Sequence, residues 1–90
     1  MALNHPQYKA AVVQAAPAFL DLQAGIEKSI RLIEEAAQAG AALIAFPEVW
    51  LPGYPFYIWL GTPAWYMSKG YVQRYFDNSL SYDSPEADAL

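Results

Sequence analysis

Residues 42–55 read ALIAFPEVWLPGYP, and this segment decides how the rest of the sequence is interpreted. It begins with the apolar run ALIAF, which has the length and composition of a buried strand. Pro47 ends this strand, because proline has no N–H group to donate to a sheet. Glu48 therefore directly follows the carboxyl end of a predicted strand. In an open parallel sheet, this is the edge at which ligands bind.

The sequence upstream supplies the elements that a parallel pair of strands requires. Residues 9–16 (KAAVVQAA) form another apolar run, closed by Pro17, and predict a strand that is covered on both faces. Between the two runs, apolar residues at three- and four-residue steps predict a helix over residues 22–39, with Asp21 as N-cap and Gly40 after its end. The expected buried stripe consists of Leu22, Ile26, Ile30, Ile33 and Ala37. Strand, helix and strand in this order predict a right-handed parallel βαβ unit.

The sequence downstream predicts a loop and two more helices. Residues 48–61 are rich in proline, glycine and aromatic residues and predict an irregular loop. Thr62, followed by proline, is typical of a helix start, and we expect this helix to continue to about Asn78. Ser84, also followed by proline, repeats the signal shortly before the last residue. A helix so short is not stable alone, since isolated helices of about 12–15 residues are already marginal.

The composition also indicates that these residues are incomplete on their own. Of the 90 residues, 56% are hydrophobic and only 16% are charged. A domain of this size buries only about 60% of its surface, which leaves part of this apolar material uncovered. Most of the aromatic residues lie between Phe46 and Phe76, and we interpret most of them as core and interface residues. We therefore predict an α/β fold of which these residues form a β-α-β-α part.

Several classes of function are excluded or disfavoured. The chain has no cysteine and a single histidine, His5, so it cannot by itself supply a thiol nucleophile, a Ser-His-Asp triad or a metal site built from histidine or cysteine. The net charge is −4 and the basic residues are scattered, which disfavours binding to nucleic acid. Prolines and glycines interrupt the uncharged residues 49–68, which disfavours a membrane span, and no secretion signal is visible. We expect a soluble, cytoplasmic protein.

Glu48 is the candidate catalytic residue. A carboxylate at the end of a parallel strand, among apolar sequence neighbours, suits a general base. The alternative is a solvated glutamate in a loop. A single carboxylate without an identified partner does not decide between these two interpretations.

The motif around Glu48 resembles a known family. FPE after an apolar strand, followed by the PGYP turn, looks like the first catalytic motif of the nitrilase, or carbon–nitrogen hydrolase, superfamily. The resemblance covers nearly the whole chain, from YKAAVVQAAP through the helix to VQRYFDNSL. FPE alone is a weak signal, whereas its combination with these other segments is specific. Within the superfamily, the sequence looks closest to nitrilases that act on arylacetonitriles or aliphatic nitriles.

The resemblance implies a fold and a mechanism. Residues 1–90 would be the N-terminal part of a single carbon–nitrogen hydrolase domain, an α-β-β-α sandwich. Glu48 would match the general base of the family, which takes the proton from a cysteine thiol. The cysteine attacks the nitrile carbon to give a thioimidate, a lysine stabilises the developing charge, and water releases ammonia and the acid. The cysteine and lysine motifs of the family lie beyond Leu90. No cofactor or metal is implied, and the default assembly is a homo-oligomer.

Other residues in the motif region have weaker assignments. Tyr54 and Trp59 lie in the loop that, by the resemblance, lines one side of the substrate pocket, where aromatic walls would suit an apolar nitrile. Alternatively, Tyr54 fixes the loop and Trp59 packs in the core. Lys69 lies inside a predicted helix and lacks the strand-end position of the family lysine, so we interpret it as a solvated charge. Lys9 and Lys28 match that position no better.

Three kinds of function remain open from the sequence. The first is a nitrilase that is active only together with the remainder of its chain. The second is a cyanide-converting enzyme or an amidase of the same superfamily, because these share the glutamate. The third is a non-catalytic α/β module that binds a partner through its aromatic face.

Overall fold

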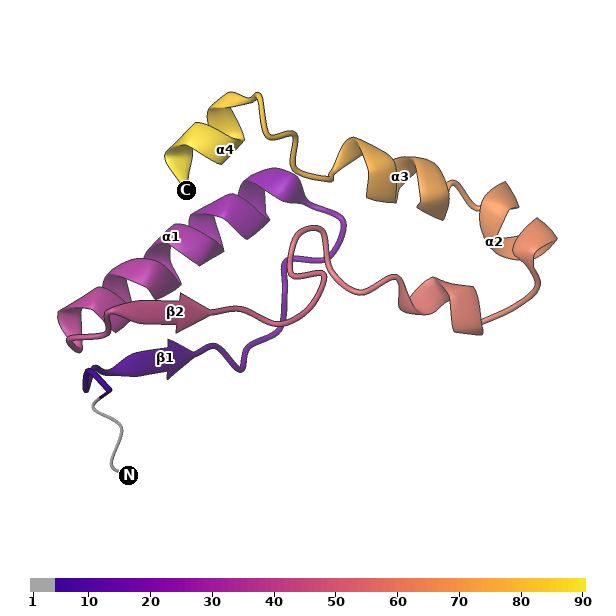
Figure 1. Ribbon diagram of the computed structural model, residues 1–90. Helices are drawn as coiled ribbons and strands as arrows, with labels where there is room; N and C mark the ends of the chain where they lie inside the picture. Colours follow the sequence, from indigo (N-terminus) through magenta and orange to yellow (C-terminus); the bar gives the residue numbers. More distant parts are fainter. Residues whose placement is uncertain (1–4) are drawn as a thin grey trace.

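The computed structural model describes residues 5–90 and places them in a βαβ unit with an arm of short helices attached to it (Figure 1). The elements, in chain order, are β1 (Ala10–Val12), α1 (Leu22–Gln38), β2 (Leu43–Ala45), the 3-10 helix η1 (Phe56–Trp59), α2 (Pro63–Ser68), α3 (Tyr71–Asp77) and α4 (Pro85–Ala89). The βαβ unit lies at one end, and the arm, which comprises η1, α2 and α3, extends away from it (Figure 1). The predicted β-α-β-α order is confirmed.

The two strands pair in parallel, as the sequence predicts. Ala10, Ala11 and Val12 lie opposite Leu43, Ile44 and Ala45. Hydrogen bonds from Ala42 N to Lys9 O (2.8 Å) and from Val13 N to Ala45 O (2.9 Å) extend the pairing beyond the strand bounds. Both strands therefore end at the same edge of the sheet, just before Glu48 in the case of β2.

The prediction that both faces of the strands are covered is wrong for the part of the chain that the structure describes. Ala11 and Ile44 are half-buried, whereas Val12 is 75% exposed and Leu43 is 53% exposed. Side chains of a strand alternate between the two faces of a sheet, and α1 lies along only one of them (Figure 1). The other face has no covering layer within residues 5–90.

Helix α1 has the ends that the sequence predicts. Asp21 is the N-cap, and its Oδ1 accepts a hydrogen bond from Ala24 N at 3.0 Å. Gly40 follows the helix with a φ of +89°, a left-handed conformation that glycine adopts readily. Within the predicted stripe, Ile26 is buried but Ala37 is exposed, so the buried face is concentrated in the first half of the helix.

The helix predicted from Thr62 to Asn78 is instead two helices. Thr62 caps α2 as expected, with its Oγ1 accepting a hydrogen bond from Trp65 N at 3.3 Å. Gly70 then has a φ of +74°, which ends the helical path of α2 and starts α3 in a new direction. The continuous helix was wrong because a glycine inside a helical pattern permits this left-handed residue.

Part of the aromatic-rich region forms a small core, as expected. The ring of Tyr57 lies 5.7 Å from that of Tyr66, 5.1 Å from Tyr71 and 6.5 Å from Tyr75, and so joins η1, α2 and α3. Tyr57 is only 4% exposed. Burial raises the pKa of its hydroxyl above the usual range, and the nearby Tyr75 and Tyr66 add to this shift.

The last part of the chain returns to α1. Asn78, at the end of α3, accepts a hydrogen bond from Leu22 N at 3.1 Å through its Oδ1. Ser84 caps α4 by accepting a hydrogen bond from Ala87 N at 3.2 Å, and α4 packs beside α1 (Figure 1). None of the helices formed by residues 5–90 is long and apolar enough to cross a membrane.

The dimensions show how little of this structure is enclosed. The Cα radius of gyration is 16.9 Å, whereas a compact domain of this length has a radius of about 12 Å. Large apolar side chains are exposed on both parts of the molecule, among them Val12, Trp59, Met67 and Phe76.

We therefore expect this chain alone to be poorly folded or to aggregate, because its sheet face and arm expose apolar surface to water. Size-exclusion chromatography with light scattering, together with NMR of methyl groups, tests this. A monomer with dispersed methyl signals and one cooperative unfolding transition would contradict it.

Candidate functional site

Glu48 begins a tight turn directly after the carboxyl end of β2. Ala45 is the last residue of the strand, and the turn comprises residues 48–52. Because β1 and β2 are parallel, this turn and the loop that follows β1 lie at the same edge of the sheet (Figure 1). This placement agrees with the expected ligand-binding edge of an open parallel sheet.

The apolar surroundings expected for Glu48 are not formed by residues 5–90. The side chain of Glu48 is exposed, whereas Trp50 is only 7% exposed and Pro52 is fully buried. The turn directs the apolar residues that follow Glu48 into the protein and leaves the carboxylate outside. Apolar neighbours in the sequence therefore hold the backbone of Glu48 rather than enclose its side chain.

A buried hydrogen-bond chain fixes the turn to α1. The Nε1–H of Trp50 donates to Ser29 Oγ at 2.7 Å, and Ser29 Oγ donates to the carbonyl of Gly25 at 2.7 Å. Ser29 is 2% exposed. Lys28 adds a contact from the same helix, with its Nζ 6.0 Å from the centre of the Trp50 ring and donating to Ala16 O. The turn is therefore attached to both α1 and the loop after β1.

Two glycines allow the backbone to approach closely at this attachment. A Cβ on Gly25 would lie 2.5 Å from Leu51 Cδ2, so the Leu51 side chain would have to shift if this position were not glycine. Gly53 has a φ of +108°, and a Cβ there would lie 2.9 Å from the ring of Phe19. The Gly53 N–H donates to Val49 O at 2.9 Å and closes the turn. Gly25 thus lets the Leu51 side chain of the turn lie against the backbone of α1, and Gly53 lets Phe19 lie against the backbone of the turn.

Two residues of this region other than glycine have a left-handed backbone. Val49 has a φ of +53° and Leu20 a φ of +54°. This conformation is unfavourable for residues with a Cβ, most of all for a β-branched residue such as valine. The Leu20 N–H donates to the carbonyl of Pro52 at 2.9 Å, which joins the loop after β1 to the turn.

Tyr54 and Trp59, the predicted substrate-binding residues, lie beyond the turn on exposed surface. Tyr54 is 48% exposed and Trp59, the last residue of η1, is 75% exposed. Among residues 5–90, no hydrogen bond or ring contact joins either of them to Glu48 or to each other. The alternative that Trp59 packs in a core does not hold within the described part of the chain.

Lys69 and Lys9 contact groups other than Glu48. Lys69 follows α2, and its Nζ lies 5.8 Å from the centre of the Trp65 ring. Lys9 Nζ donates to the carbonyl of Ala39 at 2.8 Å. Neither of these lysines follows a strand, which agrees with their interpretation as residues without a catalytic role.

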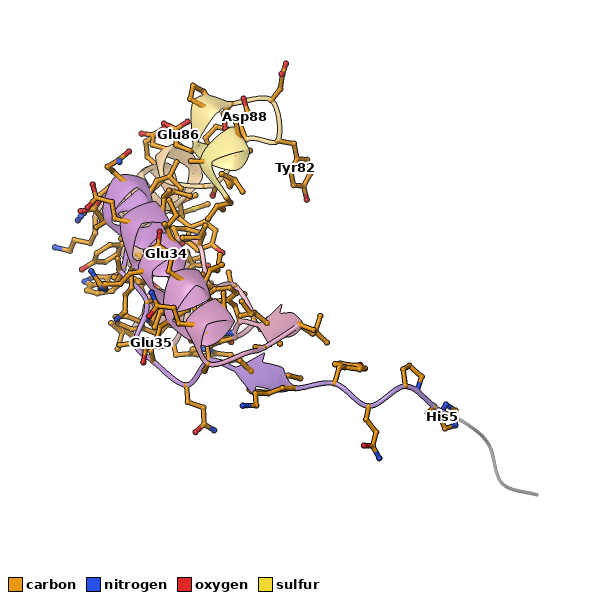
Figure 2. All side chains as sticks on the ribbon, turned by 90° about the vertical axis from the view of Figure 1, so that its left-hand side faces the viewer. His5, Glu34, Glu35, Tyr82, Glu86 and Asp88 are labelled. Carbon is orange, nitrogen blue, oxygen red and sulfur yellow. The ribbon has the colours of Figure 1, made fainter. Side chains whose placement is uncertain are left out.

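The acidic residues and the histidine do not gather into a metal site in the described part of the chain. Figure 2 shows His5 on the extended N-terminal segment, away from Glu34 and Glu35 on α1 and from Glu86 and Asp88 on α4.

Sequence reasoning missed Ser29 and Trp50 as parts of this site. A signal for Ser29 was present, because Gly25 and Ser29 are small residues four positions apart, which places them on the same face of a helix. Together with Ile26, they lie on the buried face of α1. Small residues on a buried face indicate a close approach of another segment.

Comparison with known proteins identifies the family. The carbon-nitrogen hydrolase family model matches residues 9–90. The chain is 60% identical over 79 residues to a nitrilase of Pseudomonas syringae pv. syringae (strain B728a), which is 88% of this chain and 23% of that protein. It is 54% identical to an arylacetone-specific nitrilase of Alcaligenes faecalis, over 87% of this chain and 21% of the relative. A cyanide hydratase of Stereum hirsutum (strain FP-91666) is 51% identical, over 89% of this chain and 21% of the relative.

The chain thus spans less than a quarter of the length of these relatives. The family match includes both strands, α1, the Glu48 turn and the whole arm. It confirms the resemblance that the FPE and PGYP segments indicated, and the chain belongs to the carbon–nitrogen hydrolase family.

Proposed function

We propose that residues 1–90 are the N-terminal part of a single carbon–nitrogen hydrolase domain, an α-β-β-α sandwich, that hydrolyses a nitrile to the carboxylic acid and ammonia. The observation that carries this proposal is the position of Glu48, exposed at the carboxyl edge of the parallel strands, on a turn that α1 holds in place. The similarity to nitrilases, including arylacetone-specific and aliphatic nitrilases, supports a nitrile as substrate.

In the proposed reaction, Glu48 is the general base. Its carboxylate accepts the proton of a cysteine thiol, and the thiolate forms a C–S bond with the nitrile carbon as one C–N π bond breaks. The proton then passes from Glu48 to the nitrogen, which gives a thioimidate and returns Glu48 to its carboxylate form. A lysine stabilises the charge that develops on the nitrogen. Water, activated by Glu48, then adds to the same carbon, and ammonia leaves to give a thioester. A second water cleaves the C–S bond, which releases the acid and returns the thiol. Since this sequence has no cysteine, the remainder of the chain would supply the nucleophile. It would also supply the lysine, because Lys9, Lys28 and Lys69 lack the strand-end position of the family lysine.

The exposure of Glu48 within residues 5–90 is consistent with a cysteine and a lysine that come from the remainder of the chain. The remainder of the chain would enclose Glu48 and the open face of the sheet, and this would exclude water from the reacting groups. Tyr54 and Trp59 would form aromatic walls of the enclosed pocket. We further propose a homo-oligomer located in the cytoplasm, without a cofactor.

A cyanide-converting enzyme is the second candidate. Three cyanide hydratases are 51%, 48% and 46% identical to this chain, each over 89% of its residues. The same glutamate and thiol chemistry would serve cyanide, a much smaller substrate than an arylacetonitrile. Activity of the full-length protein on cyanide, with none on phenylacetonitrile or an aliphatic nitrile, would favour this candidate.

We expect this chain alone to have no activity on nitriles, because the proposed chemistry requires a thiolate and the sequence has no cysteine. Ammonia release from phenylacetonitrile is the measurement, with a mock purification from host cells without the gene as the control. Release above that control would contradict the mechanism.

In the full-length protein, Glu48→Gln should lower kcat by about 10²–10⁴-fold, the usual effect of removing a general base. The melting temperature should change little, because glutamine has nearly the same shape as glutamate and removes no packing contact. Turnover and thermal unfolding are measured on the same preparation. Turnover near that of the wild type would remove Glu48 from the mechanism.

If Trp59 forms a wall of the pocket, Trp59→Ala in the full-length protein should raise KM for an aromatic nitrile by about 2–10-fold, the size of one aromatic contact. The value of kcat should change little, because such a contact is the same in the ground and transition states. Trp59→Phe is the matched control and should retain most of the affinity. The same comparison of Tyr54→Ala with Tyr54→Phe tests the other residue, and an unchanged KM for an alanine variant would exclude that residue from the pocket.

A further inference from the structure

Ser29 is a buried polar residue in the middle of α1 whose hydroxyl has two partners. The hydroxyl donates to the carbonyl of Gly25, one turn earlier in the helix, at 2.7 Å. This bond fixes the direction of the oxygen lone pairs, and the oxygen accepts the Nε1–H of Trp50 at 2.7 Å. A methyl side chain at this position, as in alanine, would leave the buried N–H of Trp50 without an acceptor.

Trp50 is held in one orientation by contacts on several sides. Its ring lies 5.3 Å from the ring of Phe46 and 6.0 Å from Lys28 Nζ, in addition to its hydrogen bond to Ser29. It is two positions after Glu48 in the sequence and is 7% exposed. The orientation of Trp50 therefore constrains the backbone that leads from Glu48.

Val49, the residue between Glu48 and Trp50, has a φ of +53°. A β-branched residue remains in this conformation only where its surroundings hold it, and such residues are frequent at functional sites. On one side, the Val49 carbonyl accepts the N–H of Gly53 at 2.9 Å. On the other side, Trp50 is fixed to α1 by its hydrogen bond to Ser29 Oγ at 2.7 Å.

We propose that Ser29 is a positioning residue for Glu48. Through Trp50 it keeps Val49 in the left-handed conformation, and this conformation sets the direction in which the Glu48 carboxylate leaves the sheet edge. The inference rests on the proposed function of Glu48 as the general base. A base must lie within hydrogen-bond distance of its proton, and a displacement of about 1 Å lowers the rate by about 10²-fold.

The test uses Ser29→Ala and Trp50→Phe in the full-length protein. Ser29→Ala removes the acceptor, and Trp50→Phe removes the donor while it retains most of the ring. Each variant should lower kcat by about 10–100-fold and leave KM within about 2-fold, because the base is misplaced whereas the substrate contacts remain. Ile26→Val is the matched control: Ile26 is 3% exposed on the same face of α1, and its truncation should lower the melting temperature without lowering kcat.

A double-mutant cycle shows whether Ser29 acts through Glu48. In a Glu48→Gln background, Ser29→Ala should lower kcat by no more than about 2-fold, since the group it positions is already absent. If Ser29→Ala lowers kcat equally in the wild-type and Glu48→Gln backgrounds, the positioning role is overturned. The same holds if Ser29→Ala and Ile26→Val lower the melting temperature equally and have the same kcat. If Ser29→Ala does not fold, Trp50→Phe decides by the same criteria.

The two proposals fail in different ways. Activity near that of the wild type in Glu48→Gln would overturn the proposed function and the positioning role together. A large loss in Glu48→Gln with full activity in Ser29→Ala and Trp50→Phe would overturn the positioning role alone.

Discussion

Two consecutive strands can pair in parallel only if the chain between them returns to the edge from which it started, and in this protein α1 makes that return. The pairing of β1 with β2 places the loop after β1 and the turn after β2 side by side, where the Leu20 N–H donates to the Pro52 carbonyl. The same helix that makes the crossover also carries Gly25 and Ser29, which receive the turn. The position of Glu48 at the sheet edge depends on this one crossover.

The features that the sequence predicted correctly are those with local causes. Asp21 caps α1 because its short side chain reaches an N–H group of the first turn. Gly40 follows the end of α1 because glycine adopts a positive φ readily. The parallel pairing followed from the lengths and order of the apolar runs. The family followed from the FPE and PGYP segments, and the match over residues 9–90 confirms it.

The features that the sequence did not predict depend on contacts between distant residues. The small residues Gly25 and Ser29 indicate that a segment approaches α1, but nothing in the sequence indicates that Trp50, 21 positions after Ser29, is its hydrogen-bond partner. The exposure of Val12 and Leu43 depends on which layers cover the sheet, which an apolar run does not reveal. Gly70 could have continued a helix or ended one, and only its φ of +74° decides between these. For Glu48, the sequence indicated the position at the strand end but not the direction of the side chain.

The hydrogen bond between Leu22 N and Asn78 Oδ1 has a consequence for the order of folding. The first N–H groups of a helix have no partner within the helix, and here one of them is satisfied by a residue 56 positions later. Domains begin to fold while the chain is being synthesised from its N-terminus. Helix α1 can form its internal hydrogen bonds early in synthesis, but Leu22 N gains its Asn78 acceptor only after α3 has left the ribosome.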